Sequence, residues 1–272
     1  MSILQWVAAM AKPGETREAG YWEVNERLQI ESPDASLADE VQEVAAVKSQ
    51  FEVDAASVIM THKGRRYRLP KGRAEFDQPF ATGWPRCIRE VESERYLVNA
   101  HGSFYEMPRD DGLPLLKPVC SHSKQIMDFC TWRGLLVLSG TRPAAKPNGH
   151  LFSGPAGLGL WFGQVDDLWK LGKPVGSGGP WRDTPVQAGV PSDPYLMTNY
   201  DRKTIELSHG ADGDVTITIE VDFDHHGWHV YKKFAVPPGK TVSHVFPDGF
   251  EAHWVRVRAD RACTATAWLK YE

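Results

Sequence analysis

The stretch Gly64-Arg-Arg-Tyr-Arg-Leu-Pro-Lys71 recurs 38 residues further along the chain as Gly102-Ser-Phe-Tyr-Glu-Met-Pro-Arg109. In both copies a glycine precedes a short strand-forming run that contains a tyrosine and ends at a proline. Glycine followed by such a run is typical of the turn and second strand of a β-hairpin. A period of about 40 residues suits a four-stranded propeller blade. Two similar hairpins would give the same pattern, so the repeat leaves both architectures open.

Short strand-forming runs continue on both sides of this repeat. From Phe51 onward, β-branched and aromatic runs alternate with Gly, Pro, Asn and Asp, which favours strands joined by turns. Before residue 172 we expect strands at 56–61, 65–69, 95–99, 103–107 and 134–139. After residue 195 we expect them at 203–208, 215–221, 229–236, 241–246, 253–258 and 264–271.

The chain divides into four segments on this pattern. Residues 1–50 carry helical spacing at 3–10 and 36–48, and residues 51–172 form a propeller-like β domain. Residues 173–194 are rich in Gly and Pro, which indicates a linker or a long ordered loop. Residues 195–272 read as a β-sandwich-like unit, or as closing blades of the same propeller. The predicted fold is therefore all-β, with short N-terminal helices, partial propeller-like blades and a C-terminal sandwich-like unit.

Composition excludes several classes of protein. The 272 residues are 42% hydrophobic and 24% charged, with a net charge of -4, so a basic nucleic-acid surface is not expected. No apolar run reaches the length of a membrane span, and the first residues lack the features of a secretory signal. We expect a soluble cytoplasmic protein, or a secreted one if the natural start lies upstream. Ten Trp exceed what a core of this size needs, and spare aromatics often line ligand surfaces.

Cysteine and histidine spacing gives no clear metal site. Cys87, Cys120, Cys130 and Cys263 show no CxxC or Cys/His ligand spacing, which favours buried thiols over a zinc knuckle. A disulfide between Cys120 and Cys130 stays open. The run His225-His-Gly-Trp-His229 could hold a metal, but its turn-like context favours a polar loop. We therefore expect neither a metal nor a cofactor.

Chemistry-bearing residues concentrate between residues 101 and 133, on or beside neighbouring predicted strands. Because propeller strands converge on a central axis, these side chains could meet in one pocket. We expect catalytic roles for His101, Tyr105, His122 and Arg133. Substrate-binding roles are expected for Glu106, Lys124, Asp128, Trp132 and Trp161.

These residue types suit β-elimination from a uronate. A His can remove the proton next to a carboxylate, a Tyr can protonate the leaving oxygen, and Arg133 or Lys124 can neutralise the carboxylate. A hydrogen-bonded structural role is the alternative for His101 and for His122. Glycoside hydrolysis by paired carboxylates is weaker, because the adjacent acids Asp110-Asp111 and Asp166-Asp167 would point to opposite faces of a strand.

Longer segments carry a resemblance to a known family. These are residues 99–108, 128–140, 159–174, 178–184 and 191–197, together with the run from residue 252 to the C-terminus. They resemble the C-terminal portion of larger, mostly uncharacterised bacterial β-propeller proteins. A more distant likeness is to propeller enzymes acting on rhamnose–glucuronate linkages, which implies His and Tyr in a central site. The chain is short for a complete propeller, and its first fifty residues do not look like the missing blades.

The leading hypothesis is thus a carbohydrate-active protein that cleaves a uronate- and rhamnose-containing polysaccharide by β-elimination. A non-catalytic glycan-binding or assembly module is the alternative, and a glycoside hydrolase is third. Three or four blades would leave open sheet edges. A truncated gene product, a homodimer that covers these edges, or a fold other than a propeller would each reconcile the short length.

Overall fold

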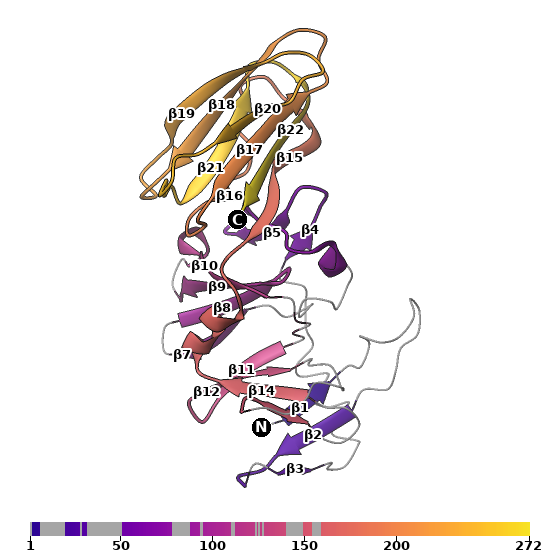
Figure 1. Ribbon diagram of the computed structural model, residues 1–272, viewed down its shortest axis with the longest axis vertical. Coiled ribbons are helices and arrows are strands. Elements are labelled where there is room, and N and C mark those ends of the chain that lie inside the picture. Colours follow the sequence, from indigo (N-terminus) through magenta and orange to yellow (C-terminus); the bar gives the residue numbers. More distant parts are fainter. Residues whose placement is uncertain are drawn as a thin grey trace.

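A computed structural model shows a mostly β protein in which sheets follow one another along its longest axis (Figure 1). The C-terminal sandwich lies at one end and the N-terminal strands lie at the other. The structure describes residues 2–5, 20–27, 29–31, 51–77, 88–92, 95–109, 112–122, 124, 126, 128–139, 149–153 and 159–272. None of the helices in these ranges has the length and hydrophobicity needed to cross a membrane.

The C-terminal unit consists of two packed antiparallel sheets, which confirms the expected sandwich. One sheet has the order β15-β22-β17-β20, with β15 at Gly176–Val186, β17 at Lys203–His209, β20 at Val242–Val245 and β22 at Cys263–Tyr271. The other contains β16 at Tyr195–Leu196, β18 at Val215–Asp222, β19 at His229–Val236 and β21 at Trp254–Ala259. Side chains alternate between buried and partly exposed along β17, because one face of its sheet meets the core.

The hairpin of β5 (Val58–His62) and β6 (Arg65–Leu69) extends the second of these sheets. Strand β6 pairs in parallel with β16 at Arg68 and Tyr195, and β4 (Glu52–Val53) pairs with β5 at the outer edge. The resulting seven-stranded sheet runs β19-β18-β21-β16-β6-β5-β4. The first copy of the sequence repeat therefore belongs to the sandwich sheet.

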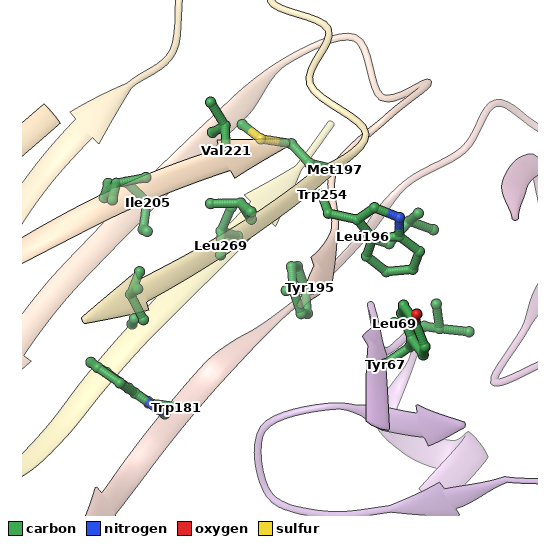
Figure 2. Close-up of a cluster of buried hydrophobic side chains, with 14 of the residues drawn as sticks. Tyr67, Leu69, Trp181, Tyr195, Leu196, Met197, Ile205, Val221, Trp254 and Leu269 are labelled. Carbon is green, nitrogen blue, oxygen red and sulfur yellow. The ribbon is translucent and has the colours of Figure 1, made fainter. Parts of the chain in front are cut away.

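Apolar packing fixes the hairpin in this position. Tyr67 and Leu69 of β6 join the same buried cluster as Leu196 and Trp254 (Figure 2). The rings of Tyr67 and Trp254 lie 5.1 Å apart between centroids. Burial of large aromatic side chains such as these stabilises the contact by a few kcal/mol each, on the order of 2.

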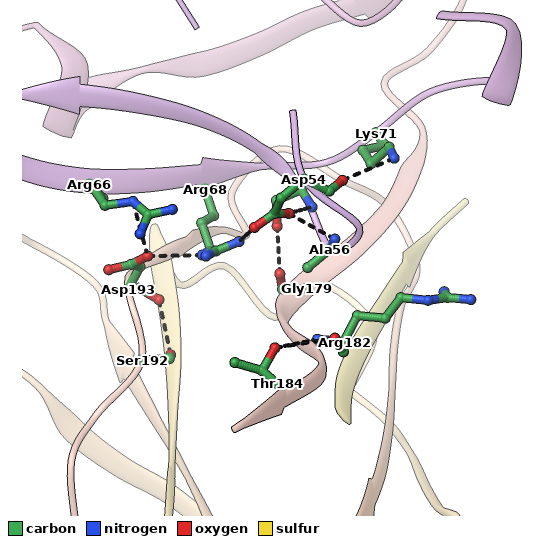
Figure 3. Close-up of polar contacts among 11 residues, drawn as sticks. Asp54, Ala56, Arg66, Arg68, Lys71, Gly179, Arg182, Thr184, Ser192 and Asp193 are labelled. Atoms are coloured by element: carbon green, nitrogen blue, oxygen red, sulfur yellow. Dashed lines mark hydrogen bonds and ion pairs between the residues drawn. The ribbon is translucent and has the colours of Figure 1, made fainter. Parts of the chain in front are cut away.

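Arg68 adds a polar link across the same contact. Its Nη1 lies 2.8 Å from Asp54 Oδ2 and its Nε lies 3.0 Å from Asp193 Oδ2 (Figure 3). The side chain of Arg68 is 10% exposed, so each carboxylate offsets part of the cost of burying the guanidinium. Asp193 precedes β16, so this ion pair holds the hairpin and the sandwich together.

Two four-stranded antiparallel sheets follow the hairpin. The first has the order β10-β9-β8-β7, from β7 (Ile88–Glu92), β8 (Arg95–Ala100), β9 (Ser103–Pro108) and β10 (Lys117–Ser121). The second has the order β11-β12-β14-β13, from β11 (Asp128–Trp132), β12 (Leu135–Ser139), β13 (Leu151–Ser153) and β14 (Gly159–Gly163). Short 3-10 helices lie at η2 (Ala74–Asp77), η3 (Leu113–Leu115) and η5 (Val165–Leu171).

Both faces of these blade-like sheets are apolar. In β9, Phe104 packs toward the second blade while its neighbour Tyr105 packs toward the sandwich core. In β12, Leu136 and Leu138 face the first blade while Val137 faces Val24 of the N-terminal sheet. Alternation that buries both faces is what stacked blades require. The expected blade-like sheets are thereby confirmed. The first copy of the repeat lies in the sandwich sheet and the second in a blade, so the two copies are similar hairpins rather than two blades.

The same turn geometry recurs in three hairpins. Lys63-Gly64, His101-Gly102 and Arg133-Gly134 each have two successive positive φ angles, between 49° and 82°. This combination is that of a type I′ turn, which matches the right-handed twist of the paired strands. Glycine fits the second position because it has no Cβ.

The N-terminal segment differs from the helical expectation. β1 (Ser2–Gln5), β2 (Gly20–Val24) and β3 (Ile30–Glu31) form a three-stranded antiparallel sheet. Residues 3–5 of the expected helix at 3–10 pair with β2 as part of β1, because a short apolar run suits a strand as well as a helix, and residues 6–10 lie outside the described residues. The expected helix at 36–48 lies outside the described residues.

The Gly/Pro-rich stretch holds a long strand. β15 occupies Gly176–Val186 and pairs with β22, with register shifts after Gly178 and after Trp181. Gly179 lies so close to β22 that a Cβ would meet the carbonyl oxygen of Ala267. Glycines in this stretch therefore allow β15 to lie close to β22. Composition alone did not distinguish such a strand from a linker. The segment boundaries otherwise stay a prediction, as does the homodimer.

No disulfide joins the described cysteines. Cys120 is buried, and burial raises the pKa of its thiol to about 12. Cys130 lies on β11, and no disulfide joins it to Cys120. Cys87 lies outside the described residues.

Candidate functional site

His101 is buried and held on both ring nitrogens. Its Nδ1 accepts a hydrogen bond from the backbone N–H of Gly72 at 2.9 Å, so the neutral ring carries its proton on Nε2. That Nε2 donates to Asp77 Oδ1 at 3.0 Å, and Lys71 Nζ lies 2.7 Å from the same oxygen. Burial lowers the pKa of His101, although Asp77 acts in the opposite direction. The ring is engaged in holding η2 against the first blade.

His122 is held in a similar way on the neighbouring strand end. Its Nδ1 accepts from the backbone N–H of Lys124 at 3.3 Å, and its Nε2 donates to Asn99 Oδ1 at 3.0 Å. The amide of Asn99 in turn donates to the carbonyl of Ile126. Burial lowers the pKa of His122 to about 4, so the ring is neutral near pH 7. This geometry favours the hydrogen-bonded structural role that the sequence left open for both histidines.

Tyr105 lies on the other side of the same blade. His122 packs on the ring of Phe104 at 5.1 Å, and adjacent residues of a strand point to opposite faces. Tyr105 is fully buried in the sandwich-side core, where burial raises the pKa of its hydroxyl to about 12. His122, one of the two predicted bases, and Tyr105, the predicted proton donor, therefore face away from each other.

Arg133 and Trp132 lie at the turn of the second blade. Arg133 is stacked over the Trp132 ring at 5.0 Å, and its Nη1 donates to the carbonyl of Glu26. Both line a pocket of about 430 Å³, which we call the turn pocket. Its lining residues are Val91, Thr131, Trp132, Arg133, Gly134, Leu136, Gln164, Val165 and Asp166.

The remaining predicted binding residues are dispersed. Trp161 is buried between the two blades and stacks on His150 with ring centroids 5.3 Å apart. Asp128 caps the start of β11 through the N–H of Phe129, and Lys124 is exposed beside His122. Glu106 lies at the far end of β9. The predicted cluster thus divides among separate places, and its catalytic roles stay a prediction.

A second pocket opens where the first blade meets the sandwich. Its volume is about 510 Å³, and we call it the junction groove. It is lined by Arg95, Glu106, Met107, Pro108, Leu115, Lys117, Phe223, His225 and His253. Antiparallel pairing brings the start of β8, the end of β9 and the start of β10 to one edge of the blade. Pockets between domains are common binding sites.

Charged side chains gather on the blade side of the junction groove. Lys117 lies directly across from Glu106 in the β9–β10 ladder. Arg95 Nε lies 3.9 Å from Glu106 Oε2, with both side chains more than 40% exposed. Two cations flank one carboxylate here, in a chain whose net charge is -4. The blade side of the groove therefore favours an anionic ligand.

The sandwich side supplies aromatic rings and two histidines. Phe223 is 49% exposed and packs against Phe250 at 5.8 Å. His253 donates from Nε2 to the carbonyl of Leu116 at 2.9 Å, and its ring lies 4.5 Å from that of His225. Burial lowers the pKa of His253 to about 4. A neutral His253 adds no charge to that of Arg95, Lys117 and Glu106.

Sequence reasoning identified only Glu106 among the groove's polar residues as a binding residue. It missed Arg95, Lys117 and Phe223, and it interpreted His225 as part of a polar loop. The clustered histidines at 225–229 were the one signal available. No group of three or more His, Cys, Asp or Glu that could hold a metal occurs in the part of the chain that is described.

The sequence matches no known family profile, and no curated protein matches it. Among solved structures, one similar chain is a glycoside hydrolase family 43 arabinoxylan arabinofuranohydrolase from Bacillus subtilis in complex with cellotetraose. The similarity covers 79% of this chain and 72% of that chain, with a TM-score of 0.21 and 10% sequence identity. Similarity at this level defines neither a shared site nor shared chemistry. The resemblance to larger bacterial propeller proteins stays a prediction.

Proposed function

We propose that the protein is a carbohydrate-active protein that binds an acidic saccharide in the junction groove. The observation that carries the proposal is the meeting of an exposed aromatic ring with two cations in one groove. Phe223 comes from the loop after β18, whereas Arg95 and Lys117 come from the first blade. The site therefore exists only because the two units pack together.

The apolar lining suits the carbon face of a sugar ring. Phe223 is 49% exposed and Leu115 is 39% exposed, and both line the groove with Met107 and Pro108. Covering exposed apolar surface stabilises a complex by about 25 cal/mol per Å² before the costs of binding. An aromatic ring loses little conformational entropy when a ligand packs on it.

The cations suit the carboxylate of a uronate. Arg95 and Lys117 stand on either side of Glu106, so each can turn toward a ligand carboxylate while Glu106 accepts hydrogen bonds from sugar hydroxyls. Hydrogen bonds between charged partners contribute about 1.5–3 kcal/mol each. An acidic saccharide would pair its carboxylate with the two cations, whereas a neutral one would leave both cations without a charged partner.

Neither β-elimination nor glycoside hydrolysis gains support from the residues predicted for it. His101 and His122 have both ring nitrogens engaged, so neither can take a proton without losing a hydrogen bond. Glu106 is the one carboxylate among the described lining residues of the junction groove. Hydrolysis at paired carboxylates needs two. Binding is therefore the function that this geometry supports best.

Calorimetric titration with uronate-containing and neutral oligosaccharides tests the proposal. We expect binding of the acidic set only, with affinity that falls as salt rises because exposed charges are screened. Phe223→Ala and Lys117→Gln should each weaken binding about 10-fold or more.

Two exposed residues outside the groove give matched controls. Phe152 is 50% exposed on β13 and packs edge-on against Phe162, as Phe223 does against Phe250. Lys240 is exposed in the turn before β20. Phe152→Ala and Lys240→Gln should leave affinity unchanged. Equal losses in the control and groove variants, or no binding of any acidic oligosaccharide, would remove the proposal.

A further inference from the structure

We propose that His225 is the general base of a β-elimination carried out on a uronate in the junction groove. The inference rests on the proposed binding of an acidic saccharide there. It assigns to His225 the role that the sequence analysis gave to His101 or His122.

The backbone fixes His225 at the mouth of the groove. It lies in the loop between β18 and β19 with φ at 66°, a left-handed conformation that costs a residue other than glycine about 1 kcal/mol or more. Its N–H donates to Asp222 Oδ1 at 2.7 Å, and Asp222 is itself 8% exposed. Strain of this kind is often retained at functional sites.

Packing fixes the ring as well. The His225 ring stands at 64° to the ring of His253, with centroids 4.5 Å apart. His253 is immobilised by its hydrogen bond to Leu116 and by stacking on Trp254 at 5.5 Å. The ring of His225 therefore rests on a rigid support while one side faces the groove.

His225 keeps its ring nitrogens available. Among the residues that the structure describes, neither nitrogen of this exposed ring makes a hydrogen bond to the protein. By contrast, His101 and His122 use both nitrogens, and His253 uses one on Leu116. His225 is thus the described groove residue whose imidazole can accept a substrate proton without breaking a protein contact.

The neighbouring cations supply the second requirement. Arg95 and Lys117 line the same groove and can neutralise the uronate carboxylate. A neutralised carboxylate makes the adjacent C5–H more acidic and stabilises the negative charge that develops when its proton leaves. His225 on the sandwich side and the two cations on the blade side would therefore contact the same ligand.

The reaction balances without an oxidant or a further reactant. The His225 imidazole takes the C5 proton, and the C5–H electron pair forms the C4–C5 double bond. The C4–O bond to the next sugar breaks, and the leaving oxygen takes the proton back from the imidazolium. The products are an unsaturated uronate and a new chain end, with the imidazole regenerated.

His226 gives a built-in control beside His225. Its side chain is 86% exposed, lies 3.5 Å from Asp224 and does not line the groove. Asparagine tolerates the left-handed conformation of position 225 better than most residues. His225→Asn and His226→Asn therefore form a matched pair in which the first keeps the backbone and removes the base.

The test measures ultraviolet absorbance of unsaturated uronate, new reducing ends and calorimetric affinity on a 4-linked polyuronate oligosaccharide. We expect product from the wild type, a loss of about 100-fold or more in His225→Asn with affinity within about 3-fold, and no change in His226→Asn. Binding by the wild type without unsaturated product would overturn this inference and leave the proposed function standing. Full activity in His225→Asn would overturn the role of His225, and absence of binding would remove both proposals.

Discussion

The indole nitrogen of Trp254 donates a hydrogen bond to the carbonyl oxygen of Pro114 over 2.8 Å. The preceding residue, His253, donates to the carbonyl of Leu116 over 2.9 Å. Between these two acceptors lies Leu115, which lines the junction groove. His253 and Trp254 of the sandwich are thus hydrogen-bonded to the segment that contains η3 in the first blade. These two hydrogen bonds fix the position of Leu115 in the apolar wall of the groove.

The first prediction concerns the hydrogen bond from Trp254 to Pro114. Trp254→Phe keeps an aromatic ring against Tyr67 but leaves the Pro114 carbonyl without its donor. We expect the free energy of unfolding to fall by about 1–3 kcal/mol, measured by urea denaturation. Trp169→Phe is the control because Trp169 is 68% exposed, and it should change stability by less than about 0.5 kcal/mol. Equal effects of the two substitutions would show that the hydrogen bond does not hold the units together.

The second prediction concerns the ion pairs of Arg68. Arg68→Met leaves Asp54 and Asp193 without their buried cation and should lower stability by about 2 kcal/mol. Arg66→Met removes a more exposed arginine that lies 3.7 Å from Asp193, and it should cost less than about 1 kcal/mol. Thermal melting of both variants tests whether Arg68→Met lowers stability more than Arg66→Met does. A larger loss in Arg66→Met would contradict the structure of this contact.

The third prediction compares two equivalent turn glycines. Gly64 and Gly102 have φ angles of 77° and 82°, but a Cβ at Gly64 meets nothing within 4 Å. A Cβ at Gly102 would overlap the Phe76 ring. Gly64→Ala should therefore cost about 1 kcal/mol from backbone strain alone, and Gly102→Ala should cost at least about 1 kcal/mol more. Denaturation midpoints that fall equally would mean that the turn at Gly102 is not packed against η2.

The fourth prediction is a pH dependence of stability. Burial lowers the pKa of His122 from 6.5 to about 4, so the folded state binds this proton less readily than the unfolded chain. The resulting stability is fully present above pH 6.5 and is lost as the pH falls toward 4, by up to about 3 kcal/mol. The stability advantage of the wild type over His122→Gln should shrink by a comparable amount between pH 7 and pH 4. An advantage that is constant across this range would contradict the burial of a neutral ring.

Local sequence pattern predicted eleven of the 22 described strands. The expected strands at 65–69 and 229–236 coincide with β6 and β19, and the others differ at their ends by a few residues. Local pattern could not show that β6 pairs with β16, because Arg68 and Tyr195 are far apart in sequence. Nor could it distinguish a linker from β15, whose glycines allow close contact with β22.

The candidate site was predictable only in part. Clustering along the sequence drew attention to His101 and His122, but hydrogen bonds to Gly72, Asp77 and Asn99 occupy their rings. The junction groove joins residues 95–117 to residues 223–253, and only the packing of the blade on the sandwich brings them together. A single sequence does not show which residues far apart along the chain come together in the fold.

Chemical-shift mapping of the protein with an acidic oligosaccharide tests the central claim most directly. If the junction groove binds the ligand, the largest amide shifts will occur at Glu106, Lys117, Phe223 and His225, and at the same ligand concentration Phe223→Ala will reduce them. Shifts confined to the turn pocket around Trp132 and Arg133, or no shifts at saturating ligand, would contradict the account.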